Sequence, residues 1–202
     1  MGEAARRKKG ISELKNRNEA WLASLSLGEE RIIAEVAQTT YDKIVSIMGM
    51  TEGCYNLAFF LHEHLRRKHD VHLDIIVGWI NDGEWDGAAS HAWVEYHGKK
   101  IDISAHMTSH PEIQLSGDLI ILDHVVKQGM VSYTYWPILP NAAAEVLERM
   151  GRENLDLAAV IAHKGKEHQR ISELAKTPQG VATYFSQAPS NINYDALARV
   201  VG

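Results

Sequence analysis

The sequence predicts an α+β fold, with helices at both ends and an antiparallel sheet between them. Apolar residues recur at helical spacing before residue 70 and again after residue 140. The segment between them is rich in β-branched side chains and is divided by glycine-containing turns. Helices followed by a group of strands and then by helices are typical of α+β domains. A chain of 202 residues is also long enough to bury a substantial core.

Three helices are expected before the sheet. The first covers residues 11–26 and the second covers residues 29–47, with Gly49 just past its end. A break at residues 51–53 precedes a third helix over 54–68. The third helix carries an apolar face formed by Leu57, Ala58, Leu61 and Leu65.

The sheet is expected from β-rich segments at 71–80, 91–96, 100–104, 119–126 and 131–136. An acidic loop at 81–90 leads directly into His91 and is expected to border a functional cleft, either favouring basic substrates or serving as a solvated connection. After Pro140 the pattern returns to helix, over 141–150, 154–163, 167–176 and 192–200. These last helices are either a separate subdomain or a cover on the core, and the sequence leaves both open.

The hairpin over 91–104 has a register that the sequence itself predicts. A two-residue turn at His97-Gly98 places Glu95 opposite Lys100, a favourable pair of opposite charges. One face then carries the apolar residues Ala92, Val94, Tyr96, Ile101 and Ile103, and the other carries His91, Trp93, Glu95, Lys100, Asp102 and Ser104. A slip of one residue would move Asp102 onto the apolar face. The pattern therefore brings His91 and Asp102 to one side as diagonal neighbours.

Cys54 is the single cysteine of the chain, and it follows Gly53 at the start of the third predicted helix. Free helical N–H groups at this position favour a thiolate and can bind an oxyanion, and a glycine lets a substrate backbone approach closely. A lone cysteine is more often a small buried side chain than a nucleophile. His91 and Asp102 change that balance, because a carboxylate that orients an imidazole creates a base for a nucleophile.

Three segments resemble the transglutaminase-like, papain-like cysteine peptidase superfamily: "GCYNLAFFLHEHLRRK", "VHLDIIVGWI" and "SHAWVEYHGKKIDIS". The resemblance covers about residues 50–105. Within the superfamily, this part of the chain is similar to bacterial transglutaminase-like peptidases, including the leader-cleaving proteins of lasso-peptide biosynthesis. It implies a core in which a cysteine-bearing helix packs on an antiparallel sheet. It also implies that Cys54 is the nucleophile, His91 the general base and acid, and Asp102 the residue that orients His91.

The resemblance divides the chain into an N-terminal helical segment (1–28), a transglutaminase-like catalytic core (29–140) and a C-terminal helical extension (141–202). We assign Gly53 and Trp93 to substrate binding. Papain-type enzymes place a glutamine shortly before the cysteine as an oxyanion donor. This chain has none there, and Gln38 and Tyr41 are more distant candidates, so the second donor is unassigned.

The predicted function is a thiol-dependent hydrolase of peptide or side-chain amide bonds, acting on a peptide or protein through an acyl-enzyme on Cys54. The alternatives are an amine acyltransferase that cross-links or deamidates proteins on the same triad, and a catalytically silent interaction module. The sequence defines neither the substrate nor the oligomeric state.

We expect no cofactor, no metal site, no nucleic-acid partner and no membrane span, and a cytoplasmic location. The net charge of −5 argues against binding to phosphate backbones. One cysteine gives no internal disulfide, and no apolar run has the length of a membrane span. The eleven histidines include His62 and His64, which lie two apart and cannot share a helix face.

Overall fold

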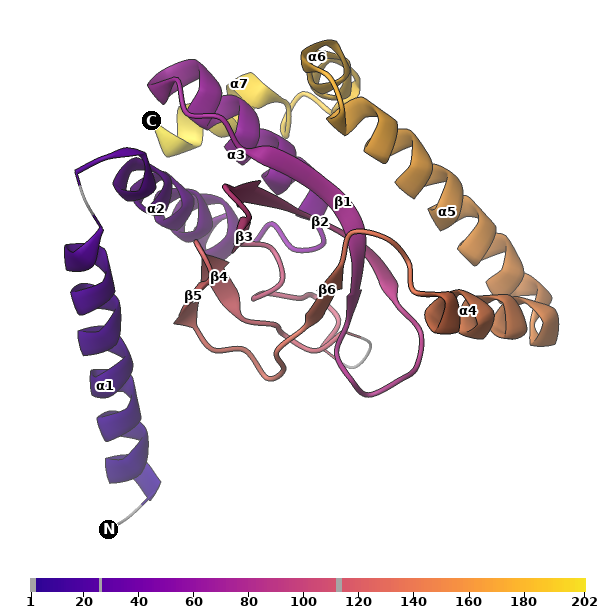
Figure 1. Cartoon of the computed structure of the whole chain (residues 1–202), viewed down its shortest axis with the longest axis horizontal. Coiled ribbons are helices and arrows are strands. Elements are labelled where there is room, and N and C mark those ends of the chain that lie inside the picture. Colours follow the sequence, from indigo (N-terminus) through magenta and orange to yellow (C-terminus); the bar gives the residue numbers. More distant parts are fainter. Residues whose placement is uncertain (1–2, 26, 112–113) are drawn as a thin grey trace.

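The computed structural model describes residues 3–25, 27–111 and 114–202 (Figure 1). The helices that precede the sheet are α1 (Glu3–Ser24), α2 (Glu29–Thr40), η1 (Tyr41–Ile47) and α3 (Cys54–His69). The strands are β1 (Asp74–Asn81), β2 (Ala89–Tyr96), β3 (Lys99–Asp102), β4 (Leu119–Ile121), β5 (His124–Lys127) and β6 (Thr134–Trp136). The helices that follow are α4 (Asn141–Glu153), α5 (Leu155–Ala175), α6 (Pro178–Gln187) and α7 (Tyr194–Val201). The predicted α+β class is confirmed.

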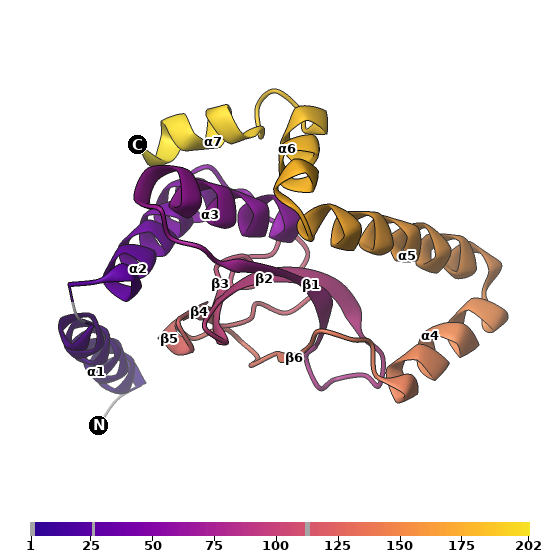
Figure 2. The same cartoon turned by 45° about the horizontal axis from the view of Figure 1, so that its top comes forward.

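The six strands form one antiparallel sheet in the order β5-β4-β3-β2-β1-β6. Helix α3 lies across one face of this curled sheet, and α6 and α7 lie beyond α3 (Figure 2). Strand β2 lies inside the sheet: β1 pairs with it over Ala89–Glu95, and β3 pairs with it over Val94–Tyr96. This arrangement holds the residues of β2 rigidly beneath the start of α3.

The hairpin between β2 and β3 has the predicted register, with Glu95 opposite Lys100. His97 and Gly98 have φ angles of 48° and 77°, which are the two positive values that a type I′ turn requires. Four of the five predicted apolar residues of this hairpin are buried, namely Ala92, Val94, Ile101 and Ile103, and Tyr96 is half-buried. Local turn chemistry and the hydrophobic pattern therefore agree here.

The C-terminal extension covers the core and shares its buried cluster. Side chains of the last three helices join those of α2, α3 and the sheet in one hydrophobic cluster, including Ile171, Val181, Phe185, Leu197 and Val201. Phe59 of α3 stacks on Tyr184 of α6 with ring centroids 4.1 Å apart. Of the two arrangements that the sequence left open, the structure has the cover on the core.

Several element boundaries differ from the prediction. The predicted strand 119–126 is two strands, because Leu122 and Asp123 adopt positive φ angles of 53° and 62° and reverse the chain. The predicted helices 154–163 and 167–176 are one helix, α5, since the polar residues between them stay helical. Helix α6 was not predicted, although Thr177 caps it by accepting from the Gly180 N–H and Pro178 occupies its first turn.

The N-terminal helices also differ in detail. The predicted helix 29–47 changes from α to π geometry at Tyr41. Helix α1 begins earlier than predicted and extends away from the sheet (Figure 1), and the predicted end at residue 26 lies outside the described residues. Its contact with the core is at β5, where Asn18 donates to the Val126 carbonyl at 2.7 Å and Trp21 stacks on His124. Within the described residues, no helix combines the length and apolar content that crossing a membrane requires.

Candidate active site

Cys54 is the first residue of α3 and lies half-buried at the edge of a cleft. Gly53 is the N-cap, and among the described residues no side chain caps this helix. The Gly53 carbonyl accepts the Leu57 N–H at 2.9 Å, which starts the helical hydrogen bonding. The N–H groups of the first turn precede that bond and point out of the helix end. The thiol therefore sits beside backbone donors that can stabilise negative charge.

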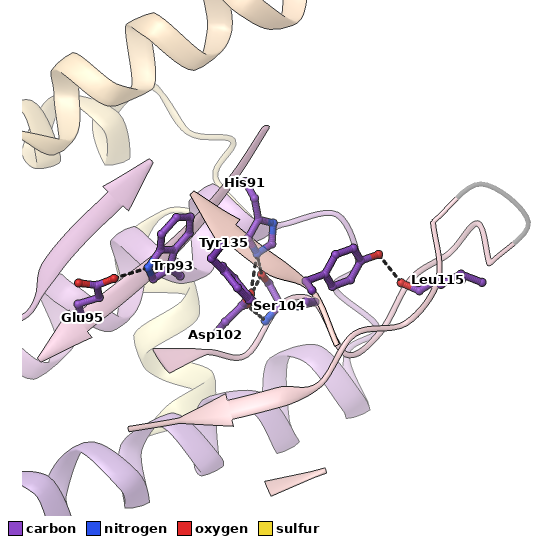
Figure 3. A network of polar contacts seen from close by, with 9 residues as sticks. His91, Trp93, Glu95, Asp102, Ser104, Leu115 and Tyr135 are labelled. Carbon is purple, nitrogen blue, oxygen red and sulfur yellow. Dashed lines mark hydrogen bonds and ion pairs between the residues drawn. The ribbon is translucent and has the colours of Figure 1, made fainter. Parts of the chain in front are cut away.

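His91 and Asp102 meet as the register predicts. His91 lies on β2 and Asp102 ends β3, and the His91 Nε2 is 2.7 Å from the Asp102 Oδ2 (Figure 3). Both residues are buried, with 4% and 2% of their surface exposed. The predicted juxtaposition is confirmed, whereas the catalytic roles of the two residues stay predictions.

Five hydrogen bonds hold the Asp102 carboxylate. Its Oδ1 accepts from the Ser104 N–H at 2.9 Å, the Ser104 hydroxyl at 2.8 Å and the Ala105 N–H at 3.3 Å. Its Oδ2 accepts from the Tyr135 hydroxyl at 2.7 Å and from His91 (Figure 3). Burial alone would raise the pKa of this carboxyl, but the His91 charge and these bonds lower it to about 2. Asp102 is therefore an anion throughout the neutral range.

The same interactions act on His91 in the opposite direction. Burial lowers the pKa of the imidazole, but the charges of Asp102 and Cys54 and hydrogen bonds to both side chains raise it to about 10. Asp102 engages Nε2, so Nδ1 is the nitrogen that remains for the Cys54 sulfur. His91 thus stands between a carboxylate on one side and a thiol on the other.

The cleft beside Cys54 has a volume of about 670 Å³. Its walls come from the start of α3, from β1 and β2, from α5, and from Ser104, Met107, Thr108 and Gln114. Cys54, His91 and Ser104 lie together on its wall, with Ala88 immediately before β2 and Ala89 at its start. Cys54 and His91 thus line one cavity that is large enough for a peptide side chain and its backbone.

The two predicted substrate-binding residues, Gly53 and Trp93, lie outside the lining of the cleft. Trp93 is 2% exposed and is not among the described residues that line the cleft. Its ring covers Gly78, where a Cβ would lie 2.6 Å from it, and its Nε1 donates to Glu95 at 2.8 Å (Figure 3), so it is a packing residue. Gly53 does not line the cleft either. A Cβ there would lie 3.0 Å from Met50, so its glycine fits a close neighbour within the chain rather than a substrate.

The distant oxyanion candidates also lie outside the cleft lining. Gln38 donates to Asp42 at 3.1 Å on the helix surface, and the Tyr41 hydroxyl is 2.7 Å from the His106 Nδ1. The side-chain amides that do line the cleft with Cys54 belong to Asn56 and Gln114. Sequence reasoning missed Gln114 because it lies sixty residues from Cys54 in a loop without a motif.

A second polar network begins one residue before His91. The Ser90 Oγ is 2.6 Å from the Tyr55 hydroxyl of α3 and 2.6 Å from the His168 Nδ1 of α5. The His168 ring stacks on Trp79 of β1 with centroids 4.5 Å apart, and burial lowers its pKa. These hydrogen bonds link the C-terminal extension to the first turn of α3. The sequence analysis did not predict them.

Among the described residues, no group of three or more His, Cys, Asp and Glu side chains is arranged to hold a metal ion. Comparisons of the chain with protein-family models, with curated proteins and with solved structures found no match.

Proposed function

We propose that this protein is a thiol-dependent hydrolase of peptide or side-chain amide bonds, with the chemistry of the transglutaminase-like, papain-like superfamily. The observation that carries the proposal is the position of His91 between the Asp102 carboxylate at 2.7 Å and the Cys54 thiol. The resemblance over residues 50–105 implies the same three roles. The cytoplasmic location stays a prediction.

The reaction has two halves, each of which conserves atoms and protons. The Cys54 proton passes to the His91 Nδ1, and the sulfur attacks the carbonyl carbon of the amide. The first-turn N–H groups of α3 support the resulting oxyanion. Collapse breaks the C–N bond, His91 returns the proton to the departing amine, and a thioester on Cys54 remains. Water then gives one proton to His91 and attacks the thioester, which releases the carboxylic acid and restores the thiol.

Asp102 assists both halves without changing its own protonation. Its carboxylate accepts the N–H of Nε2 and keeps Nδ1 facing the sulfur. It also stabilises the imidazolium that forms after each proton transfer. Because the pKa of His91 is raised to about 10, the imidazolium that forms when His91 takes the Cys54 proton is stabilised.

Alkylation by iodoacetamide tests the proposal directly, because Cys54 is the single cysteine and all labelling reports on it. At pH 6 the native protein should react faster than the same chain in denaturant, and His91→Ala should remove the difference. Exposure to p-nitrophenyl acetate should then leave an acetyl group on Cys54, detected by mass spectrometry. If Cys54 reacts with iodoacetamide only after the protein is unfolded, Cys54 is an inert core thiol.

A further inference from the structure

Helix α5 forms one wall of the cleft, although it lies outside the segments that carry the family resemblance. Seven of its residues line the cavity, namely Val160, Ile161, Lys164, Gly165, Glu167, Arg170 and Ile171. Its C-terminal half is held firmly, because Ile171 is buried in the core and His168 is bonded to Ser90. The wall is therefore rigid where it approaches Cys54.

Gly165 lies in the middle of this helix, where glycine is less favourable than alanine. No packing requirement within the described structure explains it, since a Cβ at this position would meet nothing within 4 Å. Gly165 lines the cleft, so the bare helix backbone is part of the cavity wall. An occupant of the cleft can approach α5 here more closely than any side chain would permit.

The charged side chains of the cleft contact neighbouring side chains, and two of the partners, Gln187 and Ser109, are uncharged. Lys164 pairs with Glu167 at 3.1 Å, and Arg170 donates to the Gln187 side chain at 3.5 Å. Glu52 accepts from the Ser109 hydroxyl at 2.6 Å. The remaining wall is largely apolar and includes Trp79, Ile80, Leu147, Val160 and Ile161. Val160 leaves 54% of its surface exposed, which an apolar occupant would cover.

We propose that α5 selects peptide substrates that carry a bulky apolar side chain close to the scissile carbonyl, with the peptide passing over Gly165. This inference rests on the proposed function, because the substrate enters the same cleft as the Cys54 thiol. The apolar wall gains from being covered, whereas burying a charged side chain against it would cost free energy. Gly165 supplies the space through which the peptide passes.

Dipeptidyl vinyl sulfones that carry leucine, lysine or aspartate at either of the two residues test this preference. Each rate of Cys54 modification is divided by the iodoacetamide rate of the same protein, which removes differences in thiol reactivity. Leucine at one of the two positions should exceed lysine and aspartate by about tenfold or more, as expected for a bulky side chain in an apolar pocket.

Gly165→Leu should lower the leucine preference by about fivefold or more, because its side chain fills the space above the helix. Ala162→Leu is the matched control, since Ala162 is exposed on the same helix and is not among the residues that line the cleft. It should leave the ratio unchanged. If circular dichroism shows that Gly165→Leu does not fold, Gly165→Ala replaces it. Gly165→Ala should unfold at a higher temperature, because alanine favours the helix more than glycine does. It should lower the preference for leucine by about twofold, because its methyl group fills less of the cleft than a leucine side chain.

The outcomes separate the two proposals. Failure of native Cys54 to react with iodoacetamide contradicts the proposed function. Normal iodoacetamide reactivity with equal rates for the three probes, or with lysine or aspartate favoured, overturns the role of α5 alone. An unchanged preference in a folded Gly165 variant overturns it as well.

Discussion

Two adjacent residues of β2, Ser90 and His91, begin two polar networks that differ in how they are assembled. His91 joins Asp102 within one hairpin, and five hydrogen bonds saturate that carboxylate. Ser90 instead joins Tyr55 and His168, which lie 35 and 78 residues away on two different helices. Strand β2 thus carries both a polar pair formed within one hairpin and a hydrogen-bonded link between two helices.

The networks also differ in charge. His91 faces a buried carboxylate, so its protonated form is stabilised and its pKa is raised to about 10. His168 faces hydroxyl groups and an aromatic ring, and burial lowers its pKa. The first network is built around an ion pair, and the second around a neutral imidazole. Their responses to mutation and to pH should therefore differ in size and in sign.

The largest effect is expected on catalytic turnover when His91 or Asp102 is replaced. His91→Ala should lower kcat/KM by about 10³-fold or more, because the general base is lost. Asp102→Ala should lower it by about 10²-fold or more, since Nε2 loses its partner and the ring loses its orientation. The double variant should be no worse than His91→Ala, because Asp102 acts through His91. A double-mutant cycle on kcat/KM, with any substrate that the vinyl sulfone series identifies, measures this.

Asp102→Asn is the control for shape, since it keeps the volume of the side chain. It should fold and should retain more activity than Asp102→Ala. If the losses from His91 and Asp102 multiply, Asp102 belongs to the scaffold and the assignment of the triad fails.

A smaller effect, of opposite sign in the two networks, is expected in the pH dependence of unfolding. The folded pKa of His91 is about 10 against 6.5 for the ordinary side chain, so the folded protein binds this proton more tightly. Its contribution to stability is complete below pH 6.5 and is lost as the pH rises towards 10. His168 has a lowered pKa, so its contribution is present above pH 6.5 and is lost as the pH falls below that value.

Urea unfolding from pH 5 to pH 9.5 separates the two contributions. The difference in unfolding free energy between wild type and His91→Gln should shrink towards high pH, and that between wild type and His168→Asn should shrink towards low pH. Glutamine can still donate to Asp102, and asparagine can still accept from Ser90, so both variants keep a hydrogen-bonding group. Parallel profiles for the two variants would show that the networks do not differ in charge.

The smallest effect is expected from removing a single hydroxyl from each network. Ser90→Ala leaves Tyr55 and His168 without their shared partner and should cost about 1–3 kcal/mol of stability. Tyr135→Phe should cost about 1 kcal/mol, because the Asp102 Oδ2 keeps its bond to His91. Chemical unfolding measures both. The iodoacetamide rate of Cys54 should change by less than about twofold in Ser90→Ala, since that network contains no ionic partner of the thiol. A large loss of Cys54 reactivity in Ser90→Ala would show that the two networks are coupled and do not act independently.

The hairpin and its polar pair could be predicted from the sequence because both depend on neighbours in the chain. The His97-Gly98 turn and the alternation of apolar residues permit one register, and that register places His91 beside Asp102. The start of α3 at Cys54 was likewise visible in a glycine followed by an apolar helical pattern. Strand alternation and helical periodicity repeat over a few residues, so a single sequence reveals them.

The tertiary structure alone decided what surrounds that pair. Tyr135 reaches Asp102 from β6, and His168 reaches Ser90 from α5, through packing between segments whose separation in sequence carries no periodic signal. The burial of Trp93 depends on Gly78 of the neighbouring strand, which the alternation of β2 cannot reveal. The wall of the cleft at Gly165 exists because α5 folds back over β1 and β2. Such contacts follow from how whole elements fill space against one another, and no short pattern encodes them.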